Sequence, residues 1–341
     1  RTQNTSSRVS IMSVIAAGSF AVSSSARSCS TATASAASRA PVARAAALLR
    51  RGNPLVGRAG FLAAPAASRR GLVVRADMND ILAQLFGGGG SEPQMVTPEE
   101  AIVGRSTPLR VSAKHFITGQ PMQAPFPEGN DVAVFATGCF WGTEKGYWRM
   151  PGVVSTAVGY INGFTENPTY EEVCSGQTGH TEAVQVVYDP KQVSYSDLLR
   201  LYFESHNPTQ GMGQGNDRGT QYRSGIYTTS PEQKALAEAA QAAYQKELTK
   251  NGLGEIRNEI VDAPLFYYAE DYHQQYLAKP GARPYCSAQP TGVSMPDFSS
   301  WCPAGMEAMA PKIPAAYWDK YAPRPGCTIG FPNEQVTLSS L

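Results

Sequence analysis

The first 76 residues of this 341-residue chain contain no aspartate, glutamate or lysine. They carry 11 arginines and are rich in alanine and serine. An Arg- and Ser-rich segment without acidic residues is typical of an organelle transit peptide, although some mature proteins also carry Arg-rich arms. We therefore expect residues 1–76 to be a transit peptide.

The first acidic residue, Asp77, directly follows the run Gly-Leu-Val-Val-Arg-Ala at 71–76. This run resembles a chloroplast processing site, so we expect cleavage near Ala76 and a location in the chloroplast stroma. The mitochondrion is the alternative, because its transit peptides have a similar composition.

The sequence also lacks an uninterrupted apolar run of about 20 residues, the length that a membrane helix needs. Beyond residue 76 it holds 18 basic and 28 acidic residues, a formal net charge of about −10. An acidic body offers no general attraction to nucleic acid phosphates. The sequence also shows no heptad repeat and no large exposed apolar stripe that would indicate an obligate oligomer. We therefore expect a monomer that binds neither membranes nor nucleic acids.

Cysteine is scarce, and no two cysteines form a CxxC pair. This excludes a zinc-ligand signature and a disulfide scaffold, so we expect no metal site. Thiol chemistry in a reducing compartment is the better interpretation. The six cysteines are Cys29, Cys139, Cys174, Cys286, Cys302 and Cys327.

The chain shows no internal repeats, and its composition changes along its length. Residues 77–130 predict a short helix at 77–86, a Gly linker at 87–90 and a Pro-rich extension. Residues 131–286 alternate between strands and helices and predict one α+β domain with a central sheet of about four strands. Residues 287–341 are rich in proline and glycine and predict an irregular tail that contains cysteines.

Hydrophobic periodicity and capping signals place the elements of this domain. For the helix that begins near residue 196, we expect Ser196 as the N-cap. The predicted strands are 131–136, 153–160, 181–188, 224–227 and 259–261, and the predicted helices are 141–149, 196–204, 231–249 and 269–278.

Cys139 lies between a predicted strand and a predicted helix. The positive pole of a helix stabilises a thiolate, so we expect the pKa of this thiol to lie below its usual value of about 8.5. Phe140 and Trp141 place two aromatic faces beside the sulfur, which suits an apolar methyl group. A buried structural cysteine among core aromatics is the alternative.

Glu182 lies on the apolar face of its predicted strand, beside Val184 and Val186. A desolvated carboxyl is pushed towards its neutral form, as a general acid near pH 7 requires. The alternative is a strand-end glutamate that faces solvent. His180, two residues earlier, is more typical of a structural residue than of a ligand.

The Gly-rich segment 211–224 predicts a constrained loop. It lacks the Gly-Lys-Ser/Thr ending of a P-loop and does not open a helix, which disfavours phosphate binding. Within it, Tyr222 can donate a hydroxyl hydrogen bond and Asp217 can orient its neighbours.

Taken together, these segments resemble the A-type peptide methionine sulfoxide reductases. The Gly-Cys-Phe-Trp-Gly-Thr-Glu sequence at 138–144 is similar to the signature of that family, and the resemblance runs from about residue 132 to residue 286. The other matching segments are 159–160, 167–176, 179–184, 214–217, 219–224 and 267–277.

The resemblance implies a ferredoxin-like α/β plait with additional helices. It implies a peptide-methionine (S)-S-oxide reductase that repairs oxidative damage by reducing the S epimer of methionine sulfoxide, free or in oxidised proteins. It also implies that no cofactor is needed beyond an external reductant, thioredoxin.

By resemblance, the Cys139 thiolate attacks the sulfoxide sulfur and becomes a sulfenic acid, while Glu182 gives a proton to the departing oxygen. Phe140 and Trp141 hold the S-methyl group. The remaining site residues are Tyr170 and Tyr222, whose hydroxyls bind the oxygen, and Asp217, which acts through the local network.

The sequence departs from the family pattern in the tail. Cys286 occupies the position of the resolving thiol, but Ser294 stands where relatives carry a recycling cysteine. Our hypothesis is that Cys286 resolves Cys139 directly and that Cys302 or Cys327 recycles it. The remaining thiol of the domain, Cys174, is expected to be buried and structural.

Two other classes of function remain open. A thiol peroxidase would use Cys139 but would not need the aromatic methyl pocket. A non-catalytic module that recognises oxidised methionine would keep the aromatics but would have no use for Cys139 and Cys286 together.

Overall fold

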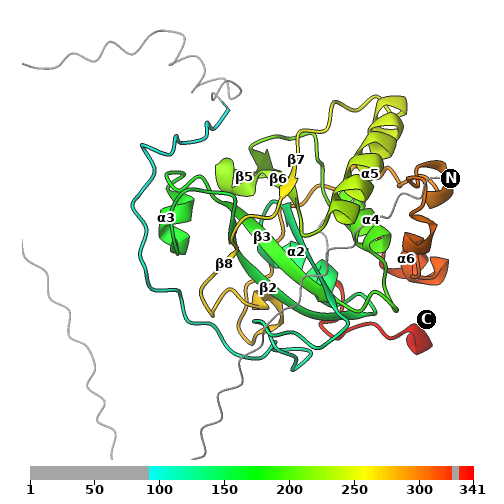
Figure 1. Cartoon of the computed structure of the whole chain (residues 1–341), viewed down its shortest axis with the longest axis horizontal. Coiled ribbons are helices and arrows are strands. Elements are labelled where there is room, and N and C mark those ends of the chain that lie inside the picture. Colours follow the sequence, from blue (N-terminus) through cyan, green and yellow to red (C-terminus); the bar gives the residue numbers. More distant parts are fainter. Residues whose placement is uncertain (1–91, 325–329) are drawn as a thin grey trace, which may run out of the picture. The chain divides into compact units, whose positions relative to one another are not determined.

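The computed structural model describes residues 92–324 and 330–341 (Figure 1). The expected transit peptide at 1–76, the expected helix at 77–86, the linker at 87–90, Cys29 and Cys327 lie outside these residues. Within the described ranges, no helix has the length and apolar character to cross a membrane.

The described residues form one α+β unit with short 3-10 turns between its longer elements. Its strands are β1 (Asp131–Thr137), β2 (Val153–Ile161), β3 (Thr181–Tyr188), β4 (Gly213–Gln214), β5 (Asp217–Arg218), β6 (Ser224–Thr228), β7 (Glu259–Asp262) and β8 (Tyr267–Tyr268). Its helices are α2 (Phe140–Trp148), α3 (Tyr170–Cys174), α4 (Tyr195–Ser205), α5 (Pro231–Lys250) and α6 (Ala315–Tyr321).

The main sheet has the strand order β7-β6-β1-β3-β2-β8, and β4 pairs with β5 as a separate hairpin. The four inner strands β6-β1-β3-β2 are antiparallel to their neighbours. Numbered along the chain, they run in the order fourth, first, third, second, with α2 and α4 as the crossovers. This topology confirms the predicted ferredoxin-like plait, to which β7 and β8 add the edges.

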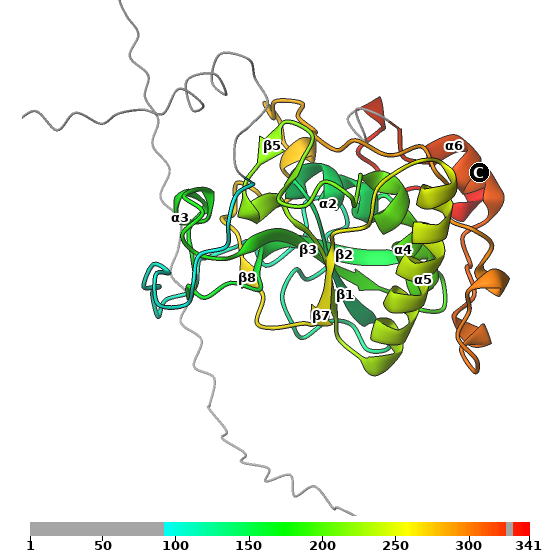
Figure 2. The ribbon, with the colours of Figure 1, turned by 90° about the horizontal axis from the view of Figure 1, so that it is seen from above.

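The period of two in the central strand divides the core between the two faces of the sheet. Val184 and Val186 of β3 pack in the larger cluster beneath α2, α4 and α5 (Figure 2), while Ala183 packs in the smaller cluster on the other face. Glu182 lies two residues before Val184, so its side chain points to the same face of the sheet, the face that α2 covers.

The predicted start of α4 is wrong by two residues. Ser194, not Ser196, is the N-cap: its side chain accepts a hydrogen bond from the Asp197 amide, and the Asp197 carboxylate accepts one from the Ser194 amide. Ser196 lies in the first turn and donates instead to the Met309 carbonyl in the tail. That tertiary contact leaves no local signal in the sequence.

The predicted helix at 269–278 is also wrong, because only a single 3-10 turn, Tyr276–Ala278, forms there. Gln275 adopts a left-handed backbone with φ 48°. The Gln274 side chain bonds both the amide and the carbonyl of Val158 on β2. These side-chain bonds fix the segment against the sheet and replace the hydrogen bonds of a helix.

The tail is less irregular than its sequence predicts, because it contains α6. Tyr317 and Trp318 of this helix are buried in the main core. The Arg200 guanidinium of α4 lies 4.2 Å from the centre of the Trp318 ring, a cation–π contact. The tail is therefore part of the folded unit.

Candidate active site

The residues predicted for catalysis line one pocket of about 270 Å³. This volume lies near the low end for ligand sites and suits a single side chain. All seven residues predicted for catalysis and methyl binding are present, and three further residues complete the wall. The lining residues are Cys139, Phe140, Trp141, Tyr170, Glu182, Asp217, Tyr222, Tyr276, Arg283 and Tyr285.

Cys139 is the N-cap residue of α2, two residues after the end of β1. The sulfur accepts hydrogen bonds from the backbone amides of Trp141 and Gly142, the free N–H groups of the first helical turn. Gly138 makes this turn possible, since its φ is 96° and a Cβ there would lie 2.6 Å from Cβ of Gln214. The geometry is therefore that of a sulfur held at a helix N-terminus.

The expected low pKa of Cys139 is wrong. Burial raises the pKa of this thiol well above its usual value, and the negative charges of Glu182 and Asp217 raise it further. The two helix amides act in the opposite direction but are outweighed. Burial therefore favours the thiol form of Cys139 in the free enzyme.

Glu182 is 2% exposed, which excludes the solvent-facing alternative. Its Oε2 accepts a hydrogen bond of 2.9 Å from the Phe140 amide. Burial raises its pKa from 4.5 to about 8, although the Phe140 bond lowers it. Below pH 8 the carboxyl is mostly neutral, and the oxygen that does not accept from Phe140 can carry the proton into the pocket.

Two tyrosine hydroxyls complete the polar part of the pocket. Burial raises the pKa of both Tyr170 and Tyr222 above the usual value, so both stay protonated and can donate hydrogen bonds. Tyr170 is positioned by Glu270, whose carboxylate accepts from the Tyr170 amide at 2.8 Å. Its hydroxyl also forms a hydrogen bond with the side chain of Cys174.

Cys174 is an exposed thiol, not the buried one that the sequence led us to expect. It ends α3, a helix of five residues in which only Val173 is buried. Burial on its inner side raises its pKa.

The aromatic wall contains residues whose roles sequence reasoning missed. The Trp141 ring stacks on Tyr276 at 4.1 Å between ring centres. The Trp141 indole donates to Nδ1 of His273 at 3.1 Å. Burial lowers the pKa of His273 to about 4, so this ring is a neutral acceptor. Both partners belong to the family-like segment 267–277, which is the signal that could have assigned them.

Asp217 faces the tail. Its two carboxylate oxygens accept hydrogen bonds from the hydroxyls of Tyr285 and Ser287. Tyr285 also packs edge-on against Trp141, with ring centres 6.2 Å apart. The predicted role of Asp217 in the local network therefore takes the form of a contact with the Cys286 segment.

Cys286 is disulfide-bonded, whereas Cys139, Cys174 and Cys302 are free thiols. The partner of Cys286 is therefore none of these three. Cys302 donates a weak hydrogen bond to the Pro303 carbonyl at 3.4 Å.

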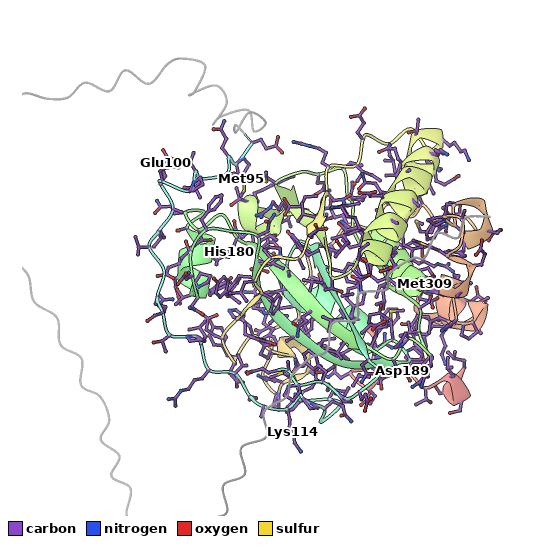
Figure 3. The ribbon with its side chains drawn as sticks, in the orientation of Figure 1. Met95, Glu100, Lys114, His180, Asp189 and Met309 are labelled. Atoms are coloured by element: carbon purple, nitrogen blue, oxygen red, sulfur yellow. The ribbon has the colours of Figure 1, made fainter. Side chains whose placement is uncertain are left out.

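His180, labelled in Figure 3, is buried and structural as expected, with Nε2 2.7 Å from the Thr165 carbonyl. In the part of the chain that the structure describes, no group of three or more acidic, histidine or cysteine side chains could hold a metal ion.

Comparisons with known proteins agree with this site. Residues 131–296 match the family model described as peptide methionine sulfoxide reductase. Peptide methionine sulfoxide reductase MsrA 1 of Synechocystis sp. is 56% identical over 218 residues, which cover 64% of this chain and 95% of the relative. The MsrA of Ectopseudomonas mendocina is 59% identical over 201 residues, which cover 59% of this chain and 91% of that protein.

Among solved structures, methionine sulfoxide reductase A of Corynebacterium diphtheriae superposes with a TM-score of 0.54 at 43% identity. The alignment covers 60% of this chain and all of that one. This chain therefore belongs to the MsrA family of peptide methionine sulfoxide reductases.

Proposed function

We propose that this protein reduces the S epimer of methionine sulfoxide, free and in oxidised proteins, with Cys139 as the nucleophile. One observation carries the proposal: a half-buried thiol shares a side-chain-sized pocket with a neutral carboxyl and an aromatic wall. The wall fits an S-methyl group, which a peroxidase would not need.

In the first step, the Cys139 sulfur attacks the sulfoxide sulfur while Glu182 protonates the departing oxygen. The Tyr170 and Tyr222 hydroxyls donate to that oxygen as charge develops on it. The protonated oxygen is then transferred from the substrate sulfur to Cys139 as the transient bond between the two sulfurs breaks. This releases methionine and leaves Cys139 as a sulfenic acid, and the thiol proton restores Glu182. Because Cys139 starts as a thiol, proton transfer accompanies the attack.

In the second step, the Cys286 thiol attacks the Cys139 sulfenic acid, forms a disulfide and releases water. Cys286 directly follows Tyr285, which lines the pocket. An external dithiol, thioredoxin, then reduces the disulfide. Cys302 is a free thiol and is therefore not the disulfide partner of Cys286 in this structure. For recycling, we retain Cys302 or Cys327 as the thiol that relays the disulfide to thioredoxin.

The test is turnover of each sulfoxide epimer with thioredoxin. We expect reduction of the S epimer only. Cys286→Ser should stop after about one turnover with thioredoxin but continue with a small thiol. Loss of thioredoxin-dependent turnover in either Cys302→Ser or Cys327→Ser should identify the recycling thiol. Full thioredoxin-dependent turnover by Cys286→Ser would contradict the proposed resolving role.

We also propose that residues 1–76 deliver the protein to the chloroplast stroma. Their composition supports this, with 11 arginines and no acidic residue. A fluorescent protein fused behind residues 1–76 should accumulate in plastids in cleaved form. Accumulation in mitochondria would support the alternative address instead.

A further inference from the structure

The segment that carries Cys286 is bound to the β4–β5 hairpin. Asp217 of β5 accepts hydrogen bonds from Tyr285 and Ser287, the two neighbours of Cys286. Gln214 of β4 accepts a hydrogen bond of 3.0 Å from the Gln289 amide. The fit is close, because a Cβ on Gly215 would lie 2.2 Å from the Ser287 carbonyl oxygen.

Successive side chains from Ala282 to Tyr285 point into two different cavities. Arg283 and Tyr285 line the pocket that contains Cys139. Ala282 and Pro284 line a different cavity of about 300 Å³, beside Lys145 of α2. Cys286 itself does not line the Cys139 pocket, and its sulfur is bonded to a cysteine other than Cys139.

Attack on Cys139 therefore needs a rearrangement. For Cys286 to face the pocket, the segment must turn about its own axis, which withdraws Tyr285 from the pocket and pulls Ser287 away from the hairpin. Both hydrogen bonds to Asp217 then break. These bonds stabilise the arrangement in which the pocket is complete and oppose the one in which Cys286 reaches Cys139.

We propose that Asp217, Tyr285 and Ser287 form a tether whose release limits the attack of Cys286 on the Cys139 sulfenic acid. This inference rests on the proposed role of Cys286 as the resolving thiol. The tether acts after methionine has formed: Cys286 loses its proton, the new S–S bond replaces the S–O bond, and the hydroxyl leaves as water. Ser287 is thus a positioning residue that acts through its neighbour.

The test is the lifetime of the sulfenic acid in fully reduced enzyme mixed with one equivalent of the S sulfoxide. Aliquots are trapped with dimedone, and labelled Cys139 and released methionine are measured in parallel. Ser287→Ala should shorten the lifetime about tenfold, since a hydrogen bond to a charged group is lost. The rate of methionine release should stay unchanged, because Ser287 does not line the pocket.

Ser287→Thr is the matched control, since it keeps the hydroxyl and should keep the wild-type lifetime. Tyr285→Phe, which removes the other hydroxyl, should also shorten it. An unchanged or longer lifetime in both Ser287→Ala and Tyr285→Phe would overturn the tether. Cys286→Ser separates the two proposals: it should greatly lengthen the lifetime, and a wild-type lifetime there would refute the resolving role itself.

Discussion

At the scale of single residues, the half-buried Cys139 thiol and the buried Glu182 carboxyl determine how protons move. Burial raises the pKa of both groups, and a negative charge on Glu182 raises the pKa of Cys139 further. Below pH 8 the favoured state holds both protons, one on the thiol and one on the carboxyl. The site is therefore poised to give a proton to the sulfoxide oxygen and to recover one from the nucleophile.

The first prediction concerns the pH dependence of this step. The folded pKa of Glu182, about 8, lies above its ordinary 4.5, so the proton-donating form is present below pH 8 and is lost as the pH rises through that value. The single-turnover rate of methionine release should fall accordingly. Glu182→Gln should lower the rate about 100-fold or more and remove the inflection near pH 8. An inflection that persists in Glu182→Gln would assign it to another group.

The second prediction concerns Tyr222. Tyr222→Phe removes one hydroxyl donor to the departing oxygen but leaves the ring in place. We expect the single-turnover rate to fall about 100-fold with little change in the substrate concentration that gives half the maximal rate, because the oxygen gains charge only in the transition state. A change in that concentration alone would instead make Tyr222 a binding residue.

Sequence patterns could locate these side chains but not their ionisation. The alternation of β3 correctly placed Glu182 inside, and burial then shifts its pKa in the expected direction. For Cys139, burial raises the pKa whereas the amides at the helix N-terminus lower it. The sequence pattern predicts the helix N-terminus but does not show how strongly the thiol is desolvated. Tyr276 and His273 were missed because their contacts with Trp141 join segments more than 130 residues apart.

At the scale of elements, α4 shows how capping and tertiary contact combine. Asp197 accepts the hydrogen bond that closes the capping box, and it also accepts from the Lys312 amide of the tail. The same residue therefore fixes the start of a core helix and the docking of the tail.

The third prediction tests this helix start. Ser194→Ala should lower the free energy of unfolding by about 1–2 kcal/mol, measured by denaturant titration, because the Asp197 amide loses its acceptor. Ser339→Ala is the control: it removes an exposed tail hydroxyl that is hydrogen-bonded to Thr337, and it should change stability by less than about 0.5 kcal/mol. Equal effects of the two substitutions would contradict the assignment of the cap.

The strands were easier to predict than the ends of helices. β3 occupies the predicted residues because strict alternation leaves only one register that buries Val184 and Val186. Ser194 and Ser196 are both residue types that cap helices, but only Ser194 has an acidic residue, Asp197, three positions later to close a capping box.

At the scale of the whole molecule, the C-terminal tail packs against α4 and the main core through α6. Residues beyond 296 lie outside the family match, yet Tyr317 and Trp318 are as buried as the core of the domain. The sequence did not reveal this, because α6 spans seven residues between prolines and is too short to show periodicity. Its docking depends on side chains of α4 that are far away in sequence.

The fourth prediction tests this docking. Trp318→Ala should lower the free energy of unfolding by about 3 kcal/mol or more, since a large buried ring and its contact with Arg200 are lost. Leu338→Ala is the control, because that tail side chain is 46% exposed and should matter little. A loss for Trp318→Ala no larger than for Leu338→Ala would show that α6 is not docked in solution.

The most direct test of the central claim counts the methionine released from the S sulfoxide by reduced enzyme without an external reductant, and locates the transferred oxygen by mass spectrometry. The account predicts one methionine per molecule of Cys286→Ser, with one added oxygen on Cys139, and no methionine from Cys139→Ser. Methionine release by Cys139→Ser, or an oxygen found on a different cysteine, would contradict it.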